Sequence, residues 1–267
     1  MSTVFDGHSY ARPAVGSKET LASLTREDLV EWHKLHQRTL VPVIVIVGDT
    51  QGTGLMASIT ETLTNEDLFE RDISTLPTPA LDLGREENIE TASRKQTALV
   101  YGFIGPTNSN PDRFALRILG NVVSGLGGRF FEAIREQQGL AYTVMASDVP
   151  LTKSGVVFTY TAFSPANEMQ VLEALEAEIE SLIVDGITED ELRKAINYSI
   201  GVHEMRLQTR RGRILAYARA VYAGTGVSSV DDYSRDIQRV GLEFVQSVAA
   251  RYLSPATAKI AILRGTN

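Results

Sequence analysis

The 267-residue sequence contains no cysteine and only four histidines, at positions 8, 33, 36 and 203. Without cysteine the chain can form neither a disulfide nor a thiolate metal site, so cysteine usage does not distinguish an oxidising from a reducing compartment. A basic excess is also lacking, because 26 Lys and Arg residues are outnumbered by 33 Asp and Glu residues, giving a formal net charge of −7. This balance argues against a nucleic-acid partner, which would favour a basic face.

Long hydrophobic runs are absent as well. The longest one, residues 40–47, contains Pro42 and is far too short to span a bilayer. Residues 1–16 are polar and lack the apolar segment of a signal peptide. With 43% hydrophobic and 22% charged residues, the composition predicts a soluble globular protein without a membrane partner, in either the cytoplasm or the periplasm.

Hydrophobic periodicity predicts a mixture of helices and strands. Helices are expected at residues 26–37, 55–63, 112–123, 166–184, 188–207, 212–222 and 242–252. Strands are expected at residues 43–47, 97–104, 140–144, 155–163 and 258–263. Thr25 with Asp28, and Thr188 with Glu191, have the spacing of capping boxes at two of the helix starts. The order predicts an α+β fold in which a mixed or antiparallel sheet is covered by helices.

One segment breaks this pattern. From residue 69 to 95 there is no apolar period, and the segment contains Pro77, Pro79 and the charged run 85–87. A stretch of this length without structure is uncommon inside one compact domain. The sequence therefore predicts a linker at residues 76–94 between a first unit, residues 1–75, and a second unit, residues 95–267.

The residues from 124 to 144 predict a glycine-rich turn, a helix from Arg129, a stop at Gly139 and a strand. This geometry can bring Arg135, in the last helical turn, and Tyr142, early in the strand, to one edge of a sheet. Taken alone, an arginine there usually complements the helix dipole, and a tyrosine in a strand usually packs against its neighbours.

The runs Gly127-Gly128-Arg129-Phe130-Phe131, Ile134-Arg135-Glu136 and Gly139-Leu140-Ala141-Tyr142 resemble the signature of the non-zinc half of the pitrilysin/insulinase zinc metallopeptidase family. That family includes the mitochondrial processing peptidases and many bacterial zinc proteases. The resemblance also extends to residues 8–16 and 24–49, which look like the second half of the family's N-terminal domain. It implies a processing-peptidase-like metallohydrolase fold, with residues 1–75 as the closing half of an N-terminal domain and residues 95–267 as a complete C-terminal domain.

The resemblance also implies a function. The Tyr142 hydroxyl and the Arg135 guanidinium are expected to bind substrate carbonyl oxygens beside the scissile bond and to stabilise the oxyanion, while the loop at Gly127 and Gly128 contacts the peptide substrate. Family members add substrate as a strand at a sheet edge. The expected partner is a zinc-bearing subunit, in a homodimer or heterodimer. Because some relatives are structural subunits, a non-catalytic structural or binding subunit remains the alternative.

The zinc motif of the family, His-x-x-Glu-His, is missing from this sequence. His33 and His36 are separated by Lys34 and Leu35, and His203 has no second histidine at helical spacing. We therefore expect no metal site and no cofactor in this chain, with zinc held by a missing half-domain or a partner subunit. Alone, the chain is expected to be proteolytically inactive.

Overall fold

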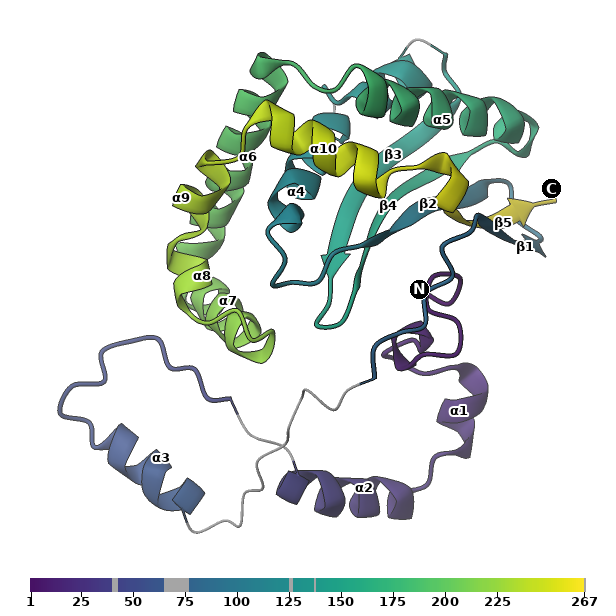
Figure 1. The fold of residues 1–267 in the computed structure, drawn as a ribbon. Coiled ribbons are helices and arrows are strands. Elements are labelled where there is room, and N and C mark those ends of the chain that lie inside the picture. Colours follow the sequence, from purple (N-terminus) through teal and green to yellow (C-terminus); the bar gives the residue numbers. More distant parts are fainter. Residues whose placement is uncertain (40–42, 65–76, 125–126, 137, 267) are drawn as a thin grey trace.

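The computed structural model describes residues 1–39, 43–64, 77–124, 127–136 and 138–266 (Figure 1). Five strands form one sheet in the order β1-β5-β2-β4-β3. Their bounds are β1 Glu86–Ala92, β2 Thr97–Gly105, β3 Ala141–Pro150, β4 Gly155–Phe163 and β5 Lys259–Gly265. β1 runs parallel to β5, and the other neighbouring strands are antiparallel, so the sheet is mixed.

Helices cover one face of this sheet (Figure 1). α4 (Asp112–Val123) packs against β3, and α10 (Leu242–Tyr252) packs against α4, β2 and α5 (Glu168–Val184). A second helical layer begins with α6 (Glu189–Leu207), which packs on α4, and continues with α7 (Arg210–Tyr222), α8 (Ser228–Asp231) and α9 (Tyr233–Gln238). The fully buried side chains at the centre include Leu99, Tyr101, Ile118, Leu175 and Ile260. The predicted α+β fold, with helices over a mixed sheet, is thus confirmed.

The opposite face of the sheet carries no such helical layer among the described residues. Alternate side chains of the central strands are only half-buried on this face, which we call the open face. At one end of it, Val4 and Phe5 pack against Val156, Ile104 and Phe158. The N-terminal residues therefore cover the end of the open face where β4 begins, and leave the end where β4 finishes uncovered.

The N-terminal part consists of η1 (Ser9–Ala11), α1 (Lys18–Ser23), α2 (Arg26–Thr39) and α3 (Leu55–Thr64). The predicted cap of α2 is present, since the Asp28 N–H donates to Thr25 Oγ1 and the Thr25 N–H donates to the Asp28 carboxylate. The apolar side chains of α2 at Leu29, Trp32 and Leu35 are all more than half exposed. The helix lies away from the sheet, and the described residues supply no apolar surface to cover it (Figure 1).

Two further predictions need correction. The strand expected at residues 43–47 is not formed, and Val43, Ile44 and Ile46 are exposed. A strand needs a neighbour for its backbone groups, and no described strand lies beside this segment. Conversely, the linker expected at residues 76–94 contains β1, which pairs along its whole length with β5. Its acidic residues are tolerated because an edge strand is largely exposed, here at every position from 87 to 91.

Candidate functional site

The glycine-rich turn is shaped by a close approach of backbone at Gly128. A Cβ atom added there would lie 2.4 Å from the carbonyl oxygen of Ser124 and 2.5 Å from that of Val123. At Gly127 an added Cβ would meet nothing within 4 Å. Of the two glycines of the turn that the structure describes, Gly128 is therefore required by packing, whereas Gly127 has open space beside it.

The segment after this turn is η3 (Phe131–Glu136), a π-helix, where the sequence predicted an ordinary helix from Arg129. Single π-helical turns are rare and occur frequently at functional sites. The predicted stop is confirmed, because Gly139 adopts a positive φ of 61° and its N–H donates to the carbonyl of Arg135 over 2.9 Å. The N–H of Leu140 donates to the carbonyl of Ile134, and the chain then enters β3 directly.

Tyr142 occupies a β-bulge in β3. Ala141 is paired with Phe163 and Thr143 with Ala162, so Tyr142 has no partner of its own in the register. Bulges re-aim a side chain and are common next to active sites. Tyr142 is 72% exposed, and β3 is the last strand of the sheet, with one edge free of any described strand.

The structure brings Arg135 and Tyr142 together. The guanidinium carbon of Arg135 lies 5.1 Å from the centre of the Tyr142 ring and 4.7 Å from that of Phe131. Both distances fall within the range of a cation–π interaction. Among the described residues, Arg135 forms no ion pair with a carboxylate, and its guanidinium lies against the two aromatic rings.

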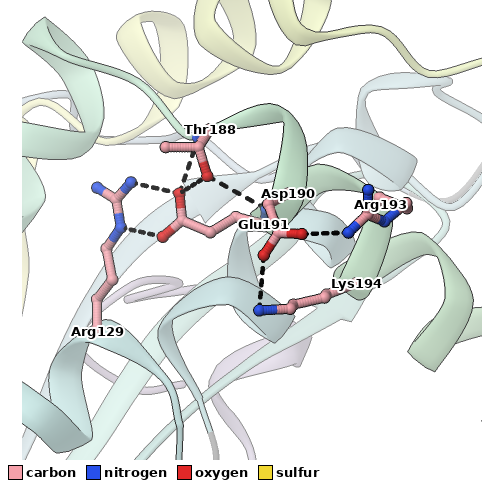
Figure 2. Close-up of polar contacts among 6 residues, drawn as sticks. All are labelled: Arg129, Thr188, Asp190, Glu191, Arg193 and Lys194. Atoms are coloured by element: carbon pink, nitrogen blue, oxygen red, sulfur yellow. Dashed lines mark hydrogen bonds and ion pairs between the residues drawn. The ribbon is translucent and has the colours of Figure 1, made fainter.

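An ion pair fixes the start of this segment (Figure 2). The Arg129 guanidinium donates two hydrogen bonds of 2.6 Å to Glu191, at the N-terminus of α6. Glu191 also accepts from the N–H and hydroxyl of Thr188, which confirms the capping box predicted there. Chiefly because Arg129 donates to the carboxylate, the pKa of Glu191 falls to about 2. The sequence indicated the cap but gave no sign of Arg129 as its partner.

His203 and His36 each lie against a backbone carbonyl and an aromatic ring. His203 Nε2 lies 2.9 Å from the carbonyl oxygen of Val230, and the ring stacks on Tyr233. His36 Nδ1 lies 2.9 Å from the carbonyl oxygen of Trp32, on the same helix, and stacks on its indole. Across the ranges that the structure describes, no three or more His, Cys, Asp or Glu side chains gather in a way that could hold a metal ion.

No described helix is both long and apolar enough to cross a membrane.

Comparison with known proteins identifies the family. Residues 23–198 match the peptidase M16 inactive domain, and this chain belongs to that family. The match confirms the resemblance drawn from the glycine-rich turn and the segment that follows it.

Named relatives agree with this assignment. A protein described as an uncharacterized zinc protease of Mycobacterium leprae is 29% identical over 73% of this chain and 44% of its own length. Another from Mycobacterium bovis is 27% identical over 95% of this chain and 59% of its own. The chain thus spans about half the length of the curated relatives it matches.

Solved structures share the fold. A peptidase M16 inactive domain from Pseudomonas fluorescens superposes with a TM-score of 0.85 at 18% identity, covering all of this chain and 64% of that one. A chain in complex III2 from Candida albicans gives a TM-score of 0.82 at 14% identity, covering 98% of this chain and 64% of that one.

Proposed function

We propose that this chain is the substrate-binding, non-zinc part of a zinc metalloendopeptidase that cleaves peptides or small proteins. Arg135 and Tyr142 bind the substrate carbonyl next to the scissile bond and stabilise the oxyanion that forms there. The observation that carries this proposal is the contact between the two side chains, 5.1 Å from guanidinium carbon to ring centre, at the exposed edge strand. Names given to the curated relatives, which describe zinc proteases, support the same reaction class.

The chemistry of the pair suits an oxyanion. A guanidinium offers several N–H donors with a permanent positive charge, and a phenol offers one O–H donor. Donors that are already in place when negative charge develops need no reorganisation, and removing one typically lowers the rate by about 10²–10³-fold. The π-helix and the β-bulge provide the positioning, because each sets the direction of one of the two side chains.

The edge of β3 is where the peptide backbone binds. An extended peptide that adds to a sheet edge is held by main-chain hydrogen bonds, which tolerate many sequences. Tyr142 and Thr143 lie at the start of this strand, close to the bulge. A peptide paired with β3 would therefore pass beside the Arg135 and Tyr142 side chains. Gly127 and Gly128 contribute the nearby loop, with open space above Gly127.

The zinc ion belongs to a part of the enzyme outside this chain, either a half-domain or a partner subunit in a homodimer or heterodimer. Residues 1–75 act as the closing half of the N-terminal domain, and the C-terminal domain extends to residue 267 and includes β1, so it begins before residue 95. Exposed apolar side chains on α2 and at residues 43–46 support this arrangement, since they suit the interior of a larger domain. The length of the relatives is also consistent with further sequence outside the chain.

A mixing experiment tests the proposal. The chain is combined with a zinc-bearing subunit or the missing half-domain, and hydrolysis of a fluorogenic peptide is followed. We expect Arg135→Ala and Tyr142→Phe each to lower kcat/KM by about 10²-fold, as loss of an oxyanion donor does. Arg193→Gln, on the exposed side of α6, is the control and should leave the rate unchanged.

Full hydrolysis by the Arg135→Ala assembly would show that the pair is not used.

A second candidate function, a non-catalytic structural subunit, is supported by the shared fold with a chain of complex III2. It predicts a stable complex with a partner in which no peptide is cleaved and in which Arg135→Ala has no effect on assembly.

A further inference from the structure

The open face of the sheet contains a pocket of about 560 Å³. Its lining residues are Arg94, Lys95, Gln96, Ala98, Tyr160, Ala162 and Leu263. Arg94 and Lys95 belong to the turn between β1 and β2, and both are exposed. Among the described residues, neither forms an ion pair with a carboxylate. Two cations thus stand at the rim of a pocket whose walls are an aromatic ring and aliphatic side chains.

This pocket lies at the same end of the sheet as the Arg135 and Tyr142 pair. Thr97, the first residue of β2, pairs with Phe163, and Phe163 pairs with Ala141, the residue before Tyr142. One step further along the strands, Ala98 pairs with Ala162, and Ala162 pairs with Thr143. Neighbouring strands are about 4.8 Å apart, so β2 is about 10 Å from β3 across the open face.

The charge of the pocket contrasts with its surroundings. The chain as a whole has a formal net charge of −7, and the adjacent strand β1 carries Glu86, Glu87 and Glu90. Glu90 pairs with Leu263 and is the acidic residue nearest to the pocket in the register, but it does not line it. An uncompensated arginine and lysine in this setting attract an anion, and arginine matches the planar geometry of a carboxylate.

We propose that this pocket binds a carboxylate of the same peptide that pairs with β3, supplied either by an acidic side chain or by the C-terminal carboxyl group. The inference rests on the proposed function. An extended peptide advances about 3.3 Å per residue. A peptide that leaves the edge of β3 near Tyr142 and crosses the open face therefore reaches the pocket within about three to five residues. Tyr160 and Leu263 pack against the aliphatic part of the bound residue, while Arg94 and Lys95 bind its carboxylate.

Direct binding to the full chain tests this inference. The probes are fluorescein-labelled decapeptides of alanine, serine and valine in which one glutamate is moved along the sequence. Each is made with a free or an amidated C-terminus, and each has a glutamine counterpart. Fluorescence anisotropy is measured at low and at physiological salt. We expect at least one carboxylate position to lower Kd by about tenfold relative to its uncharged counterpart, as a charge-assisted contact can.

The double variant Arg94→Gln/Lys95→Gln should abolish this preference while leaving the affinity for the uncharged peptide unchanged. The matched control is Arg210→Gln/Arg211→Gln, which removes the same charge from exposed positions on α7 and should keep the preference. Preference for glutamate in amidated peptides identifies a side-chain carboxylate, and preference for the free C-terminus identifies a terminal one.

Two results would overturn the inference. Peptides that bind the chain equally well with and without a carboxylate would refute the pocket but leave the edge strand and the Arg135 and Tyr142 pair intact. A carboxylate preference that survives in Arg94→Gln/Lys95→Gln would place the anion site elsewhere. By contrast, loss of the proposed catalytic role would appear only in the hydrolysis assay with Arg135→Ala, so the two failures are distinguishable.

Discussion

The part of the chain from β1 to β5 and the part from α1 to α3 differ in what covers their apolar side chains. Both contain helices with well-formed N-terminal caps, at Thr188 and Glu191 in one part and at Ser17 and Thr25 in the other. In the first part, Leu175 is completely buried, whereas Leu29 and Trp32 in the second are more than half exposed. Helix formation is thus a local property, but burial depends on a partner surface, which the described residues provide only for the first part.

Truncating one leucine in each part tests this difference in burial most strongly. We expect Leu175→Ala, in α5, to lower the free energy of unfolding by about 2–5 kcal/mol, because a fully buried side chain leaves a cavity. Leu29→Ala, in α2, should change it by less than about 0.5 kcal/mol. Urea unfolding followed by circular dichroism measures both. A large loss for Leu29→Ala would show that α2 is covered in solution, for instance by a second copy of the chain.

A second test uses the two glycines of the turn. Gly128→Ala places a Cβ against two backbone carbonyl oxygens, which cannot rotate away, so we expect a loss of about 1–3 kcal/mol. Gly127→Ala has open space and should be nearly neutral. Thermal unfolding compares the two variants. Equal stability of both would mean that the backbone of the turn can move apart, and that η3 is held mainly by its other contacts.

The smallest expected effect concerns the two ion pairs at the start of α6. Glu191→Gln weakens the half-buried bonds to Arg129 and should cost about 1 kcal/mol at neutral pH. Arg193→Gln, which removes the exposed contact with Asp190, should cost almost nothing. Chemical denaturation at pH 7 separates them. If both variants lose the same stability, Arg129 does not anchor the turn in the way described.

The stability lost in Glu191→Gln depends on pH in a direction that follows from the pKa of Glu191. The pKa of Glu191 is lowered from 4.5 to about 2 in the folded chain. Its carboxylate therefore stabilises the fold fully above pH 4.5, and this stabilisation is lost as the pH falls towards 2. The stability difference between the wild type and Glu191→Gln should shrink over that interval. A difference that stays constant from pH 6 to pH 3 would contradict the Arg129 contact.

Much of the fold could be predicted from the sequence because its signals are local. The helices at residues 112–123 and 242–252 and the strand at residues 155–163 have the predicted bounds. Local signals failed where the outcome depends on pairing. The β-branched run at 43–47 has the composition of a strand, but no described strand lies beside it. The acidic residues of β1 predicted a linker, yet this segment forms a strand because it pairs in parallel with β5.

The candidate site shows the same limit. The sequence predicted that Arg135 and Tyr142 would meet at a sheet edge, and the structure places them in contact. It gave no sign of the π-helix or of the bulge, because both arise from how η3 and β3 fit against neighbouring elements. Nor could it reveal the pocket beside Arg94 and Lys95, whose walls come from three strands distant in sequence.

The parallel pairing of β1 with β5 sets the point at which the chain can be divided. Lys259 in β5 has a side chain only 1% exposed, and its Nζ lies 3.1 Å from Glu86 and 3.6 Å from Asp82. A truncation that starts at residue 95 would remove both acidic partners and leave the Lys259 ammonium group without a counter-charge. It would also expose the unpaired backbone edge of β5, which could then pair with another chain. Anyone wishing to express the second unit alone should therefore begin the polypeptide before Asp82.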